Sequence, residues 1–350
     1  MTTLSWELGT AYDFFVSLQV IHSPADFGLR PSWAAGVRSR LPAGPREFLE
    51  RTYSFFPAPL RWIHSLPPSP KDSNAALAAL VALPAGDRLA ALTLSSDTPS
   101  PITETVGSIA QRGTWNDADL EVLRSTYQKR GYTLRANTLT NLCQAWSDPL
   151  AFGEAFLPAL QAYRDLFFAE EEQRITPVLE SSLAHAQVLS EALSLTELLS
   201  ELSQGVQLTG LDELETLHLA PSYWAGPLIF VRPLGEKQRL ILFAGRPTSQ
   251  ALVPGENVPA DVMAALKALA DPTRLRILRY LAEQPLTPRD LSRRLRLRPP
   301  TVVHHLSALR LAGLVQITIQ AEGERRYALR SEAVEAALLH TRRFLKLTSS

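Results

Sequence analysis

Two adjacent histidines, His304 and His305, are the residues of this sequence best suited to chemistry; they lie in the stretch TVVHHLSALRLAGL at 301–314. Imidazoles can bind metals, transfer protons or donate hydrogen bonds to nucleic acid. Neighbours on a helix point about 100° apart, so the pair is poorly placed to hold one metal ion, for which i,i+4 spacing is better. No carboxylate lies in the same stretch to complete a catalytic pair. The pair therefore favours contact with nucleic acid, with packing or helix capping as the alternative.

Leucines at helical spacing predict which histidine faces outward. With Val302 set at 0°, Leu306 lies at about 40° and Leu309 at about 340° on the helix, which predicts a buried stripe. His304 lies at about 200°, opposite that stripe. We therefore expect His304 to face the groove of a nucleic acid.

The remaining polar side chains of this helix divide between its outer face and one flank. Ser307, at about 140°, shares the outer face, whereas Thr301 and His305 occupy the flank at about 260° and 300°. We expect His305 to lie at the edge of the interface, where it contacts a phosphate or packs against a neighbouring helix.

The charge of the chain is divided between its two ends. The 350 residues contain 35 Lys+Arg and 35 Asp+Glu, but the stretch from Pro259 onward contains 16 basic and 8 acidic residues. A neutral chain with one basic end is typical of a nucleic-acid-binding module attached to another region. An uneven surface with no partner is the alternative.

The elements around the histidines predict a winged helix-turn-helix. Helices are expected at 259–270 and at 271–283, the latter capped by Asp271 with Pro272 at its first position. Thr287 and Pro288 begin a short helix at 287–297, and Gly313 ends the helix that carries the histidines. VQITIQ and RRYALR alternate as a β-hairpin, AEGE lies between them, and a final helix covers 331–347. This order places the second helix of the turn in the major groove and the hairpin beside the backbone.

Arginines surround the predicted recognition helix and should neutralise phosphates. The residues predicted to contact DNA are Arg293, Arg294, Arg298, Thr301, His304, His305, Ser307, Arg310, Arg325 and Arg326. A solvated basic face is the alternative for some of these arginines.

The stretches LKALADPTRLRILRYL and LSRRLRLRPPTVVHHLSALRLAGLV, followed by a hairpin, resemble the ArsR family of bacterial transcription regulators. The resemblance implies a homodimer that binds an imperfect palindrome in double-stranded DNA, usually as a repressor released by a ligand or metal. Metal sensors of this family use cysteine pairs before the turn or Asp/His/Glu clusters in the terminal helix. Here the first place reads LSRRL, the second offers His340 with Glu332 and Glu335, and the single cysteine is Cys143. We therefore expect neither a metal nor a cofactor.

Residues 1–258 are acidic and carry no nucleotide-binding, zinc-protease or serine-hydrolase motif. Helices are expected through 1–145, including one over LSWELGTAYDFFVSLQVI, and aromatic residues there form a core or line an apolar pocket. The segment at 14–42 resembles an uncharacterised helical region that precedes ArsR-type domains. Helices and a small antiparallel meander of strands LETLHLAPSYW, GPLIFVRPLG and QRLILFAG are expected at 146–250, followed by a linker rich in proline.

The predicted fold class is mainly α with small antiparallel β elements (α+β), divided into regions 1–145, 146–250 and 259–350. No signal peptide or membrane-spanning stretch is evident, and a cytoplasmic location fits one cysteine. The predicted function is a non-enzymatic transcription regulator, a homodimeric repressor whose N-terminal region senses a small-molecule effector or a protein partner. The alternatives are an enzyme or a protein-interaction module that carries a winged-helix domain.

Overall fold

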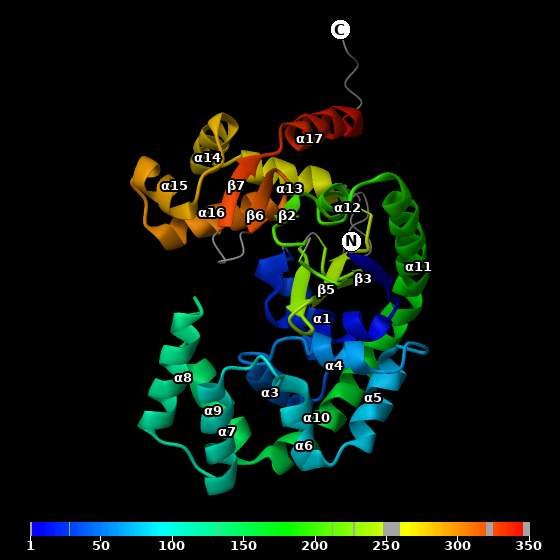
Figure 1. The fold of residues 1–350 in the computed structure, drawn as a ribbon, viewed down its shortest axis with the longest axis vertical. Helices are drawn as coiled ribbons and strands as arrows, with labels where there is room; N and C mark the ends of the chain where they lie inside the picture. The colour runs from blue at the N-terminus through cyan, green and yellow to red at the C-terminus, as the bar shows by residue number, and fades with distance from the viewer. Residues whose placement is uncertain are drawn as a thin grey trace. The chain divides into compact units, whose positions relative to one another are not determined.

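The computed structural model describes residues 2–27, 29–132, 134–211, 213–226, 228–247, 260–319 and 325–345 (Figure 1). The chain forms two compact units. One comprises Leu8–Pro24 and Leu29–Thr176, and the other comprises Met1–Glu7, Ala25–Gly28 and Pro177–Ser350. None of the helices in the described ranges is long and apolar enough to cross a membrane.

In the described residues of the unit formed by 8–24 and 29–176, the regular elements are helices. Its elements are α1 (Thr10–His22), α2 (Pro31–Ser39), α3 (Ala43–Thr52), α4 (Leu60–Ser65), α5 (Ser73–Ala82), α6 (Ala85–Thr93), α7 (Ser100–Arg112), α8 (Asp117–Lys129), α9 (Ala136–Ser147), α10 (Pro149–Tyr163), the π-helical turn η2 (Arg164–Phe168) and the start of α11 (Ala169–Ala192). Tyr12, Phe14 and Phe15 of α1 are fully buried, so these aromatic side chains are core rather than pocket lining.

The first residues of the chain form a strand, and the prediction of one helix over 4–21 is wrong there. Strand β1 (Thr3–Trp6) pairs in parallel with β3 (Thr216–Ser222), a distant segment that no local pattern identifies. Gly9 then begins α1 from an extended conformation. A Cβ atom at Gly9 would lie 2.8 Å from Cγ of Lys71, so only glycine fits this close approach.

Strands β1 and β3 belong to a mixed four-stranded sheet in the order β1-β3-β5-β4. The predicted antiparallel meander is wrong, because β5 (Gln238–Ala244) is central; it pairs in parallel with β3 and antiparallel with β4 (Phe230–Pro233). Residues 240–243 of β5 are all buried, which is typical of a strand covered on both faces rather than an alternating edge strand. Helix α12 (Leu195–Leu202) buries Leu198 and Leu199 in the same apolar cluster as Leu217 and Ile241.

The C-terminal helices and hairpin follow the predicted order. They are α13 (Ala260–Leu269), α14 (Pro272–Glu283), α15 (Pro288–Leu295), α16 (Pro299–Leu311), β6 (Val315–Ile319), β7 (Arg325–Leu329) and α17 (Ser331–Phe344), and Figure 1 draws α14–α16 grouped beside β6 and β7. Asp271 and Thr287 cap α14 and α15 as predicted, and Gly313 has φ 69°. Leu266 on α13 and Leu275 on α14 are exposed. The predicted linker after Pro247 and the hairpin turn AEGE lie outside the described residues.

A third strand joins the hairpin. Strand β2 (Val206–Leu208) pairs in parallel with β6, and the sheet has the order β2-β6-β7. The expected fold class of helices with small β elements is confirmed, but both sheets contain parallel pairs. The three-part division at 145 and 250 remains a prediction.

Candidate nucleic-acid interface

Helices α15 and α16 form a helix-turn-helix. Helix α15 ends at Leu295 and is capped by Arg296, whose left-handed backbone has φ 57°. Helix α16 begins at Pro299. Leu291 and Leu295 from α15 pack with the residues of α16 in one buried cluster. The arrangement presents the opposite face of α16 to solvent.

The buried stripe predicted for α16 is confirmed. Val302, Leu306 and Leu309 are each 0% exposed and belong to the core of the helix-turn-helix. On the outer face, His304 and Ser307 are exposed, as the helical angles predicted. Thr301 is also exposed, and Val303 beside it is 46% exposed. This face therefore offers hydroxyl, imidazole and apolar groups to a groove.

The two adjacent histidines have different surroundings. The ring centroids of His304 and His305 are 6.0 Å apart, but the side chain of His305 is only 14% exposed. Nδ1 of His305 lies 3.8 Å from Oδ1 of Asp271, the residue that caps α14. Burial lowers the pKa of His305, although the Asp271 carboxylate acts in the opposite direction. His305 therefore packs against the N-terminus of α14 at the edge of the interface.

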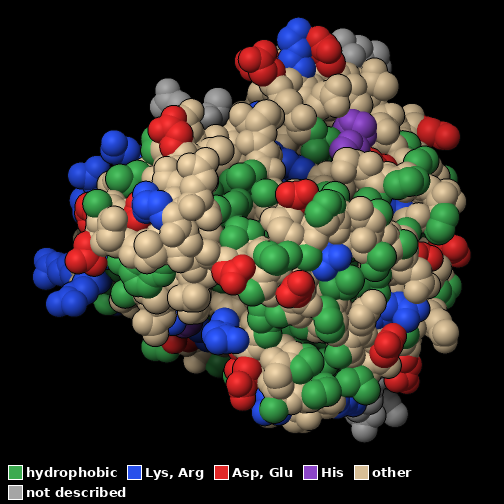
Figure 2. Space-filling view, turned by 90° about the horizontal axis from the view of Figure 1, so that it is seen from below, with side chains coloured by type: hydrophobic (Ala, Val, Ile, Leu, Met, Phe, Trp, Pro, Cys, Tyr) green, Lys and Arg blue, Asp and Glu red, His purple; other side chains and the backbone are tan. Residues whose placement is uncertain are grey.

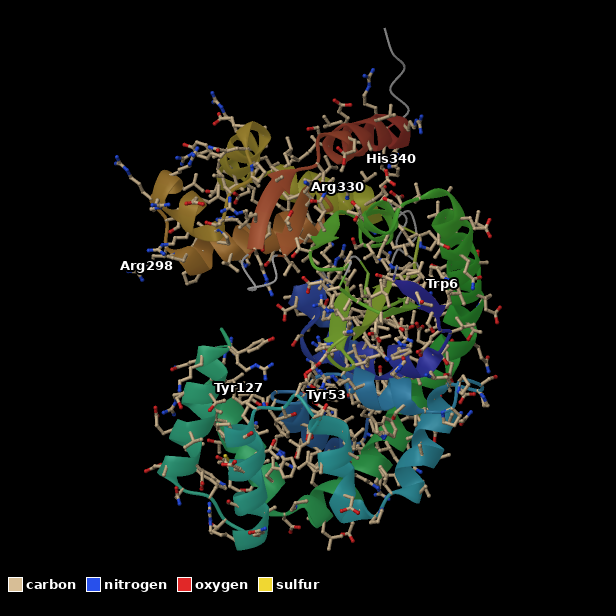
Figure 3. The ribbon with its side chains drawn as sticks, viewed as in Figure 1. Trp6, Tyr53, Tyr127, Arg298, Arg330 and His340 are labelled. Carbon is tan, nitrogen blue, oxygen red and sulfur yellow. The ribbon has the colours of Figure 1, made fainter. Side chains whose placement is uncertain are left out.

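Five of the predicted arginines lie at the surface of this module. Arg293, Arg294, Arg298, Arg325 and Arg326 are all exposed. The guanidinium of Arg293 pairs with Asp290 on α15, and that of Arg294 lies 5.6 Å from the ring centroid of Tyr280 on α14. Figure 3 shows Arg298 projecting outward from the end of the module.

The exposed arginines give this module a basic surface. Guanidinium groups at such positions can donate to phosphate oxygens on either side of a helix inserted in a groove. Figure 2 shows one face of the molecule, on which Lys and Arg side chains project together at the left edge and charges of both signs alternate elsewhere.

Arg310 departs from the prediction that it contacts DNA. Its side chain is buried, and its guanidinium donates to the carbonyl oxygen of Ser203 at 2.6 Å and of Gln204 at 3.1 Å. Burial, together with the nearby charge of Arg330, lowers the pKa of Arg310 to about 10. A guanidinium held inside the fold is not available to a phosphate, so we leave Arg310 out of the interface.

The sequence contained a signal for this burial. The same angular count that separates the histidines places Arg310 at about 80° on the helix, next to Leu306 at about 40°. Sequence reasoning also missed Arg330, whose guanidinium donates to the carbonyl oxygen of Gln204 at 2.8 Å and of Gly313 at 3.2 Å. The acceptors at 203 and 204 come from a segment more than a hundred residues away, which no local pattern connects to α16.

Helix α17 carries the residues considered for a metal site. Nδ1 of His340 lies 2.9 Å from Oδ2 of Asp261 on α13, which joins the two helices. Glu332 and Glu335 are exposed. Within the described part of this module, no three potential ligands come within reach of a single ion. His340 and Asp261 therefore form a polar contact between α17 and α13.

A shallow polar pocket lies in the described part of the helical unit. It has a volume of about 340 Å³ and is lined by Glu47, Glu50, Arg51 and Asn141. Cys143, the single cysteine, is buried, and burial raises the pKa of its thiol to about 11. A buried, protonated thiol is inert as a nucleophile.

Comparison with known proteins identifies the C-terminal module. Residues 271–316 match the family model described as "Bacterial regulatory protein, arsR family". Among solved structures, HlyU from Vibrio cholerae N16961 is 33% identical over 25% of this chain and 94% of its own, with a TM-score of 0.21. No curated protein matches the chain. The matched residues contain α14, α15, α16 and the start of β6, so the C-terminal region of this protein carries a helix-turn-helix domain of the bacterial arsR family, a regulatory DNA-binding domain.

Proposed function

We propose that this protein is a homodimeric repressor that binds a palindromic operator in double-stranded DNA. The observation that carries the proposal is the outer face of α16, where Thr301, His304 and Ser307 are exposed opposite a fully buried stripe. Side chains at such positions can hydrogen-bond to base edges in the major groove. Arg298 and the hairpin arginines Arg325 and Arg326 would contact the backbone on either side.

Exposed apolar side chains on the surface formed by α13 and α17 support the dimer. Helix α17 packs on α13, and the two helices expose Leu266, Leu338, Leu339 and Phe344 by 42–51% of their surface. A second copy of the same face would cover these side chains by a two-fold contact. The two-fold axis would place two recognition helices on successive turns of the major groove, about 34 Å apart.

The region before the module would supply the signal. We propose that an effector or a protein partner bound by that region shifts the balance between conformations with different operator affinity. The role is regulatory rather than catalytic, and it places the protein in the cytoplasm with the bacterial chromosome. The described residues of the helical unit carry aromatic core and the shallow pocket at Glu47, which leaves the class of effector open to experiment.

Selection of bound DNA from a random pool, at one fixed salt concentration, tests the proposal. The expected result is enrichment of a sequence with two-fold symmetry, because each recognition helix reads one half-site. The variant H304A should lose enrichment at specific positions, whereas H185A, which replaces an exposed histidine on α11, should select the same sequence as the unaltered protein. Recovery of unenriched DNA, or of a single half-site from a monomer, would contradict the proposal.

A further inference from the structure

The sheet of the DNA-binding module contains strand β2 (Val206–Leu208), which lies in the sequence before the first helix of the module, α13 (Ala260–Leu269). In strand β2, Val206, Gln207 and Leu208 pair in parallel with Ile317, Thr318 and Ile319 of β6. The backbone N–H of Ile317 donates to the carbonyl oxygen of Gly205 at 3.0 Å, which extends the ladder by one residue. Val206 is 3% exposed and belongs to the same core cluster as the buried residues of α16. The core of the module is therefore built partly from the segment at 203–208.

Two guanidinium groups bind the beginning of this segment to α16 and β7. Arg310, in the last turn of α16, donates to the carbonyls of Ser203 and Gln204, and Arg330 donates to Gln204 and Gly313. The carbonyls of Ser203 and Gln204 follow the end of α12, where a helix leaves carbonyl oxygens without partners. Cationic donors are favoured at that end. The guanidinium groups thus find hydrogen-bond acceptors, and the carbonyl oxygens at the end of α12 find donors.

The backbone of the segment is shaped for this contact. Gln204 and Gly205 both have left-handed backbones, with φ 54° and 92°. A Cβ atom at Gly205 would lie 2.7 Å from Cδ of Arg330. Ser203 Oγ accepts from the N–H of Val206 at 2.9 Å and fixes the turn that leads into β2. Glycine at 205 therefore permits both the turn and the approach of Arg330.

The helix that leads into this segment, α12, packs against the mixed sheet. Leu198 and Leu199 of α12 are buried in the cluster that contains Leu217 and Ile241. Leu208 packs against both that cluster and the core of the module. A displacement of α12 over the mixed sheet must therefore either carry β2 with it or break the contacts of β2 with β6.

We propose that the segment from α12 to β2 controls the position of the recognition helix, with Arg310 as its positioning residue. When β2 and the carbonyls at 203 and 204 are in place, Arg310 is paired and the last turn of α16 is held. When the segment moves away, the buried guanidinium of Arg310 loses its hydrogen-bond acceptors. Because an unpaired buried cation is costly in free energy, α16 then shifts to a position in which Arg310 is solvated or paired again. A signal that reaches α12 thereby changes affinity for DNA without any contact between this segment and DNA.

This inference rests on the proposed function for its DNA readout, and a second readout needs no DNA. The variants Arg310→Gln and Gln207→Pro are made in the full-length protein; proline removes the N–H at the centre of β2. The matched controls are Arg279→Gln, on an exposed face of α14, and Gln207→Ala, which keeps the backbone N–H. Arg310→Lys keeps the charge but donates fewer hydrogen bonds. Its amide protection in α16 and its affinity for the operator should therefore lie between those of Arg310→Gln and the unaltered protein.

The first readout is amide hydrogen exchange without DNA. Both test variants should exchange faster in the last turn of α16 and in β6, while α14 keeps the protection of the unaltered protein. A uniform loss of protection would instead indicate global destabilisation and would overturn the inference, as would unchanged exchange in α16. If Gln207→Pro does not fold, Gly205→Ala perturbs the same segment through the contact with Arg330.

The second readout is the dissociation constant for the selected operator. Each test variant should bind about tenfold more weakly, a change of about 1.4 kcal/mol. The double variant should bind no more weakly than the weaker single variant, because both changes break one linkage. Affinities equal to that of the unaltered protein, or effects that simply add, would overturn the inference. If the unaltered protein selects no DNA, the proposed function fails and the exchange readout alone decides the role of β2.

Discussion

Nδ1 of His305 lies 3.8 Å from Oδ1 of Asp271, so one of the two adjacent histidines faces the capped end of a neighbouring helix. Asp271 also accepts a hydrogen bond from the backbone N–H of Arg274 at 2.8 Å, which lowers the pKa of its carboxyl group. The recognition helix is thus joined to α14 by a polar contact as well as by its apolar stripe. His304 remains exposed beside it.

The stability of the protein should depend on the protonation of His305. Burial lowers the pKa of His305 below its ordinary value of 6.5, so the unfolded chain binds a proton more readily than the folded chain. The contribution is fully present above pH 6.5 and is lost as the pH falls through the lower, folded-state pKa. The free energy of unfolding, measured by urea denaturation from pH 7.5 to 5, should therefore decrease with acidification.

The variant H305Q isolates this contribution, because other buried histidines such as His22 also have a lowered pKa. We expect a shallower decline below pH 6.5 in H305Q than in the unaltered protein. Two parallel curves would show that His305 takes no part in the pH dependence.

Replacing His304 should change which bases are recognised. If His304 donates to a base edge, H304A should lose about 1–3 kcal/mol of discrimination at the position it reads. Binding to unrelated DNA should change little. Competition titrations with operators altered at single positions measure the effect, and H185A, at an exposed position of α11, serves as the control. Equal loss for every sequence would instead assign His304 to backbone contact.

The hairpin arginines should act through phosphates. Replacing Arg325 and Arg326 by alanine should reduce the slope of log K against log salt by about 0.9 for each lost phosphate contact. The pattern of preferred bases should remain. Fluorescence anisotropy at several salt concentrations measures the slope, with the exposed Arg279→Ala as a control. A slope equal to that of the unaltered protein would place the hairpin away from DNA.

An acidic residue on the exposed face of α17 should prevent dimer formation. Leu338 is 51% exposed, and L338D would place a charge in the proposed two-fold contact, where it lacks a partner. Sedimentation velocity should show a dimer for the unaltered protein and a monomer for L338D. The control V122D changes a 40% exposed residue of α8 and should remain dimeric. Identical sedimentation of L338D and the unaltered protein would remove this face from the interface.

Local signals predicted the helix-turn-helix well. The caps at Asp271 and Thr287 and the stripe of Val302, Leu306 and Leu309 appear in the structure as expected. A helix is closed by bonds between residues four apart, and a cap acts over three residues, so both can be inferred from a short stretch. The outward direction of His304 follows from the same spacing.

Strand pairing was less predictable. The interpretation of 4–21 as one helix missed β1. The predicted meander was wrong because β5, rather than β4, is the strand that lies next to β3 in the sheet. An apolar run such as that at 240–243 indicates a strand buried on both faces, but it does not identify the neighbouring strand. That choice depends on which distant segments cover the remaining apolar surface.

The sequence by itself determined the helices of the DNA-binding module, their caps, the buried face of α16 and the basic charge around it, because each depends on residues within a few positions of one another. Only the tertiary structure decided the role of Arg310. Its acceptors at Ser203 and Gln204 are more than a hundred residues away, and they are brought to it by the pairing of β2 with β6. A buried guanidinium is stable only if hydrogen-bond acceptors surround it, and here a distant segment of the chain supplies them. Arg310, which the sequence predicted as a DNA contact, therefore joins the module to the segment that precedes it.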